Sequence, residues 1–141
     1  MREIKFRAIA TDQIHTIDKG DWVYGLLSVN NSMLVKIDDN SGVSYVQVPI
    51  DPKTVGQYTG SKDGENGKEI YEDDIIADYN DELMIVKFGE YEKTDEYIIE
   101  GNGWYIMYLD DSRIEPINSL CIAFKEIIGN VHDNPELIEE Y

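Results

Sequence analysis

The chain has 141 residues, of which 42% are hydrophobic, and its 12 Lys and Arg against 29 Asp and Glu give a net charge of −17. This hydrophobic content is too high for a disordered chain, and the length suits one domain with a buried core. The charge disfavours direct binding to nucleic acid or to an anionic membrane, because both are recognised through Lys and Arg.

The charge is unevenly distributed along the chain. Residues 71–141 carry four Lys or Arg and nineteen Asp or Glu, a net charge of −15, whereas residues 1–70 carry a net charge of −2. A basic partner would be attracted to the acidic half. The alternative interpretation is that the acids form a solvated face that keeps the protein soluble.

The sequence predicts no targeting segment within its residues. Residues 1–7 alternate charged and apolar side chains and lack the apolar core of a signal peptide. No apolar run approaches the ~20 residues that a membrane-spanning helix needs. Cys121 is the single cysteine, so the chain requires no oxidising compartment. We therefore expect a soluble protein of the cytoplasm.

Apolar side chains recur mostly with a period of two, which is typical of strands. Turn residues separate the β-rich runs at short spacing, without intervening helices. The pattern predicts a mainly β domain with an antiparallel barrel- or sandwich-like fold built from hairpins. The runs occupy residues 4–8, 22–26, 33–37, 43–49, 74–79, 83–88, 96–100, 104–109 and 121–131.

Local signals refine this fold. Asp51 predicts one capped turn over residues 52–54. Asn102-Gly103 lies between two β-rich runs and predicts a tight hairpin. Asn134-Pro135-Glu136 combines a capping residue, a proline and an acid, and predicts a short helix at the C-terminus. We predict a single domain over residues 1–141, in which the turn-rich loop 61–67 is the best place for a subdomain break.

An acidic cluster is the first candidate for chemistry, because hard cations bind converging carboxylates. Glu72 and Asp74 would share one face of a strand, with Asp78 nearby, and these three are the candidate metal ligands. A solvated acidic face explains the same residues. The histidines and the cysteine have no metal-binding or catalytic spacing, and no nucleophile elbow or phosphate-binding loop is present. We predict no cofactor and no enzymatic activity.

Ordered sequence blocks give a further indication. Residues 54–60 read Thr-Val-Gly-Gln-Tyr-Thr-Gly and residues 67–72 read Gly-Lys-Glu-Ile-Tyr-Glu, and other blocks occupy residues 2–8, 22–25 and 128–137. Together they resemble the YopX family of small phage and prophage proteins. The resemblance implies a phage or prophage origin and a mostly β fold, and it implies no particular activity. Asp73 stands where the family usually has Gly, and Asp tolerates a left-handed turn better than most residues.

These observations favour a non-enzymatic accessory protein that acts by protein–protein contact. The predicted contact surface combines acids and tyrosines, which are Asp73, Glu90, Tyr91, Glu92, Asp95 and Tyr97. In a sharper form of this hypothesis, the surface mimics nucleic acid and binds a basic host or phage protein. Two alternatives are a metal-binding or hydrolytic module that uses Glu72, Asp74 and Asp78, and a structural protein that assembles into homo-oligomers through exposed β edges.

Overall fold

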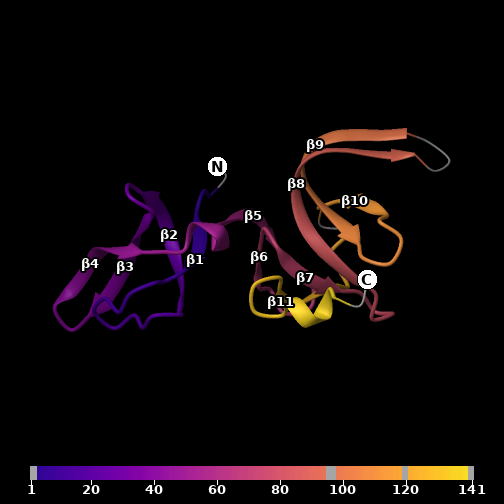
Figure 1. The fold of residues 1–141 in the computed structure, drawn as a ribbon. Coiled ribbons are helices and arrows are strands. Elements are labelled where there is room, and N and C mark those ends of the chain that lie inside the picture. The colour runs from indigo at the N-terminus through magenta and orange to yellow at the C-terminus, as the bar shows by residue number, and fades with distance from the viewer. Residues whose placement is uncertain (1–2, 95–97, 119–120, 140–141) are drawn as a thin grey trace. The chain divides into compact units, whose positions relative to one another are not determined.

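The computed structural model describes residues 3–94, 98–118 and 121–139 (Figure 1). Nearly all regular structure in these ranges is strand, arranged in two antiparallel sheets. The predicted mainly β, antiparallel fold is therefore confirmed. The chain divides into two compact units, Met1–Tyr58 and Thr59–Tyr141, and the division falls shortly before the loop 61–67.

The first unit is built on a meander of four strands. These are β1 (Phe6–Ile9), β2 (Trp22–Ser28), β3 (Ser32–Asp39) and β4 (Gly42–Pro49), each paired antiparallel with the next. Asn30 and Asn31 both have positive φ in the tight turn between β2 and β3, as a type I′ hairpin turn requires. Gly25 allows β3 to approach β2 closely, because a Cβ at this position would lie 2.0 Å from the backbone oxygen of Leu34.

Alternate residues of these strands form the core of the first unit. The buried cluster consists of Ala8, Ala10, Val23, Met33, Val35, Val48 and Ile50. After β4, the turn η1 (Pro52–Thr54) is capped by the Asp51 side chain, which accepts a hydrogen bond from the Lys53 amide, so the predicted capped turn is confirmed. β5 (Gly56–Lys62) then pairs with β1 through its first residues and continues into the second unit.

The second unit contains the remaining strands. β6 (Glu69–Tyr71) lies beside β5, and the order of the six-stranded sheet is β4-β3-β2-β1-β5-β6. The other sheet has the order β10-β9-β8-β7-β11. Its strands are β7 (Asp74–Ala77), β8 (Leu83–Thr94), β9 (Ile98–Tyr108), β10 (Ile114–Pro116) and β11 (Glu126–Asn130). The core of this unit consists of Ile70, Ile76, Met84, Val86, Ile106, Tyr108 and Ile122.

The barrel form of the predicted fold is wrong, because both sheets are open over the part of the chain that the structure describes. In the first unit, a single isolated bridge between Ala10 and Ile50 connects the end of β4 to the end of β1. Closure stops after that one pair, and β4 remains the edge of its sheet.

The predicted hairpin at Asn102-Gly103 is also wrong. Both residues lie inside β9, which pairs with β8 from Tyr108 opposite Met84 to Ile98 opposite Thr94. Gly103 faces Gly89, and these residues have φ values of 150° and 142°, which favour glycine. The two glycines therefore let the ladder bend instead of reversing the chain. Figure 1 shows the strong curvature of β8.

The predicted C-terminal helix is not formed. Up to residue 139, where the description of the chain ends, only the single 3₁₀ turn η2 (Pro135–Leu137) follows the last strand. The side chain of Asn134 does not cap this turn, because its Oδ1 accepts a hydrogen bond from the Asn130 amide at 3.2 Å. The segment is also too short for a stable helix. Within the described ranges, no helix is long and apolar enough to cross a membrane.

Candidate functional site

The negative charge is concentrated in one of the two units. Met1–Tyr58 contains six Lys or Arg and seven Asp or Glu, a net charge of −1. Thr59–Tyr141 contains six Lys or Arg and 22 Asp or Glu, a net charge of −16. A surface that attracts basic groups therefore belongs to the second unit.

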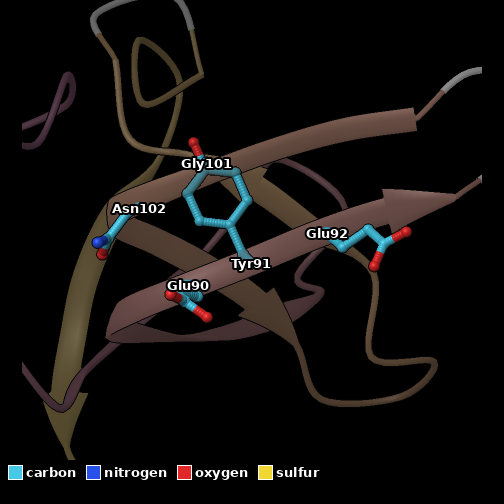
Figure 2. Close-up of a pocket in the computed structure, with 5 residues that line it drawn as sticks. All are labelled: Glu90, Tyr91, Glu92, Gly101 and Asn102. Carbon is cyan, nitrogen blue, oxygen red and sulfur yellow. The ribbon is translucent and has the colours of Figure 1, made fainter.

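The outer half of the β8–β9 hairpin carries three of the predicted contact residues. Glu90, Tyr91 and Glu92 follow one another on β8 and, together with Gly101 and Asn102 of β9, border a cavity of about 700 Å³ (Figure 2). Side chains alternate along a strand, so Glu90 and Glu92 project from one face and Tyr91 from the other. Figure 2 shows this arrangement, with the Tyr91 ring directed toward β9.

Glycine provides the space that Tyr91 occupies. Gly101 pairs with Tyr91 in the ladder, and a Cβ on Gly101 would lie 2.4 Å from both Cζ and the hydroxyl oxygen of the ring. The ring also packs against Tyr105, with 5.4 Å between the ring centroids. Tyr91 is therefore held by its neighbours on the hairpin, and this fixed position is favourable for an aromatic residue in a contact surface.

Asp73 lies apart from Glu90 and Glu92. Its amide donates to the carbonyl oxygen of Val86, and its carboxylate lies 3.6 Å from Lys87 Nζ and 3.8 Å from His132 Nε2. Lys87 is on the face of β8 that also carries Tyr91, opposite to the face of the two glutamates. Asp73 therefore lies on the side of β8 away from these glutamates, and Lys87 balances its charge. The remaining predicted contact residues, Asp95 and Tyr97, lie outside the described residues.

Two of the three candidate metal ligands accept hydrogen bonds from backbone amides. Asp74 is 1% exposed, and its carboxylate accepts a hydrogen bond from the Tyr71 amide at 2.8 Å. The Asp78 carboxylate accepts from the amides of Asn80 and Glu82, which shapes the turn before β8. Glu72 is half-buried in the turn before β7. Among residues 3–94, 98–118 and 121–139, no three His, Cys, Asp or Glu side chains converge as a metal site would need.

Asp63 is an important residue that the sequence analysis missed. It is 3% exposed, and its Oδ1 accepts from the amides of Asn66 and Lys68. Its Oδ2 accepts from the amide of Ile127, at the start of β11, at 3.0 Å. The turn-rich composition of the loop 61–67 indicated a local turn here. Nothing in the sequence pattern indicated the contact with a segment so distant along the chain.

A second cavity, of about 340 Å³, is bordered by residues from several separate segments. Arg113 lies 4.2 Å from the centre of the Tyr108 ring and pairs with Asp111 at 2.6 Å and Glu82 at 2.9 Å. Burial, together with the nearby Glu115 carboxylate, raises the pKa of Tyr108 to about 12. Because Arg113 is paired with Asp111 and Glu82, its positive charge is balanced by carboxylates of the same unit.

Comparison with known families assigns the chain. A family model described as YopX protein matches residues 5–139. The chain belongs to the YopX family. In this YopX-family chain, Asp73 has a φ of 70°, so the left-handed turn expected at this residue is confirmed. A comparison with curated proteins finds no match.

Proposed function

We propose that this YopX-family chain is a phage or prophage accessory protein that works without catalysis, by binding a basic host or phage protein. The observation that carries the proposal is the net charge of −16 on the second unit, in which Glu90 and Glu92 are exposed beside a cavity. Negative charge at this density attracts a partner rich in Lys and Arg and steers its approach.

The composition of the cavity supports a specific contact as well as general attraction. Tyr91 supplies a large aromatic surface in a fixed position, and the two glutamates supply charge on the opposite face of the same strand. Aromatic side chains contribute most of the binding energy in many protein interfaces, whereas exposed charges mainly affect the association rate. In the sharper form of the proposal, the acids stand in for phosphates and occupy a nucleic-acid site of the partner.

A capture experiment at two salt concentrations tests the proposal. The immobilised protein is incubated with bacterial lysate at about 50 mM and about 500 mM NaCl, and bound proteins are identified by mass spectrometry. We expect capture of a nucleic-acid-binding protein of basic pI at low salt, its release at high salt, and its displacement by added DNA.

Charge reversal on the hairpin distinguishes a specific surface from net charge alone. The double variant Glu90→Lys/Glu92→Lys should lose the captured protein. The control Asp12→Lys/Asp18→Lys changes the net charge equally at two exposed residues of the first unit and should retain it. The proposal is wrong if no basic protein binds at low salt, or if both double variants bind alike.

A further inference from the structure

The edge strand β4 lacks the features that normally protect the edge of a sheet. Residues 42–49 read Gly-Val-Ser-Tyr-Val-Gln-Val-Pro and contain no charged side chain, in a chain of which 29% is charged. β4 is the end strand of its sheet, with β3 as its neighbour in the strand order (Figure 1). Native proteins usually place Lys, a bulge or a very short strand at such an edge, because its free backbone groups can pair with another strand.

The strands at the other three ends of the two sheet orders have protective features. β10 has three residues, one of which is Pro116, and β6 also has three residues and begins with Glu69. β11 contains an irregularity in its register between Ile127 and Gly129. Each of these features limits pairing with an added strand. Of these four end strands, β4 is thus the one that is long, regular and uncharged.

The register of β4 identifies the backbone groups that face outward. The Ile50 amide donates to Asn31 on the β3 side, so the amides of the even-numbered residues point toward β3. By alternation, the backbone N–H and C=O groups of Val43, Tyr45 and Gln47 point toward the open edge. Pro49 is the next residue of this set, but its carbonyl oxygen accepts a hydrogen bond from the Thr11 amide at 3.0 Å, so the open part of the edge ends at Gln47.

Charge and exposure favour a second copy of this chain as the strand that pairs with β4. Val43 is 54% exposed and Tyr45 is 68% exposed, on the face of the sheet that also carries the exposed Leu34. β4 belongs to the unit with a net charge of −1, so two copies meet there with little repulsion. A contact through the second unit would instead bring together two units that each have a net charge of −16.

We infer that the protein forms a symmetric dimer in which the β4 strands of two copies pair antiparallel. The outward-facing residues are symmetric about Tyr45, so Tyr45 lies opposite Tyr45 of the second copy and Val43 lies opposite Gln47 of the second copy. This register forms about six backbone hydrogen bonds and brings the two Tyr45 side chains together on one face. A two-fold contact of this kind closes without forming a fibre.

Self-association gives the first test. Light scattering after size-exclusion chromatography, at loading concentrations from about 1 µM to about 500 µM, should show a concentration-dependent dimer. Tyr45→Lys places two like charges side by side at the two-fold axis and should raise the dimer dissociation constant about tenfold or more. The control Tyr79→Lys makes the same replacement at a side chain of the second unit that is 82% exposed, and should dimerise normally.

Cross-linking tests the register itself. In a Cys121→Ser background, Tyr45→Cys should form a disulfide-linked dimer under mild oxidation, because Cα atoms of directly paired residues lie about 5.5 Å apart, within disulfide range. Val43→Cys should not, because its two copies would be about 13 Å apart along the strands. Circular dichroism verifies that each variant is folded. A monomer at all concentrations, or equal cross-linking of the two cysteine variants, overturns the inference.

Discussion

Asp63 connects two distant segments of the chain through one carboxylate. Burial of this group raises its pKa, but the hydrogen bonds from backbone amides, led by that of Ile127, outweigh burial and hold the pKa below the usual 3.8. A depressed folded-state pKa means that the charged form stabilises the fold. This contribution is complete above the unfolded-state pKa and is lost as the pH falls through the folded-state pKa.

Replacement of Asp63 should therefore destabilise the protein at neutral pH. Asp63→Asn keeps one acceptor oxygen but leaves an amide nitrogen facing a buried N–H, which should cost about 1–3 kcal/mol in urea unfolding at pH 7. The loss relative to the natural protein should shrink as the pH falls below 3.8. Glu65→Gln, an exposed change in the same loop, serves as the control. An equal loss in both variants, or a loss independent of pH, contradicts this role.

The β8–β9 hairpin depends on glycine in two different ways. Gly101 leaves room for the Tyr91 ring, whereas Gly103 has open space beside it but a φ of 150°. The first glycine is thus required by a neighbouring side chain and the second by the backbone conformation. This distinction gives two alanine substitutions on one strand with opposite expected effects.

Alanine at position 101 should change the position of the Tyr91 ring, whereas alanine at position 103 should change the free energy of unfolding. Gly101→Ala should move the Tyr91 ring, weaken the near-ultraviolet circular dichroism of the Tyr91–Tyr105 pair and reduce partner capture. The free energy of unfolding should change by less than about 1 kcal/mol, because the half-buried ring can shift and the backbone at Gly101 is compatible with alanine. Gly103→Ala should cost about 1 kcal/mol or more through backbone strain, with the ring signal retained. The interpretation fails if the two variants show the same pattern.

The hairpin also shows where sequence patterns stop being informative. Period-two alternation was sufficient to predict most strands, and the Asp51 cap was sufficient to predict one turn. Both signals depend only on residues that are neighbours in the sequence. The pair Asn102-Gly103 is compatible both with a tight hairpin turn and with a bend within one strand. Which of the two forms depends on cross-strand packing, such as that of Tyr91 on Gly101. Likewise, no local pattern places Lys87 and His132 beside Asp73.

Over the whole chain, the net charge of −17 should lower stability through self-repulsion. Added salt screens this repulsion. We expect the melting temperature to rise by about 4 °C between about 10 mM and about 300 mM NaCl, which for a domain of this size is roughly 1 kcal/mol. Glu90→Gln/Glu92→Gln should melt higher than the natural protein at low salt and respond less to salt. A melting temperature that falls with NaCl would instead indicate that exposed ion pairs such as Arg113–Glu82 dominate.

The Asp63–Ile127 hydrogen bond has a consequence for the order in which the second unit folds. It joins residues 64 positions apart, so the chain between them must already be compact before the bond can form. Strands β6 to β10 lie in that interval. We therefore expect the bond to form in the last steps of folding and to break in the first steps of unfolding. Protonation of one carboxylate should shorten the lifetime of the native state and leave the rate of folding nearly unchanged.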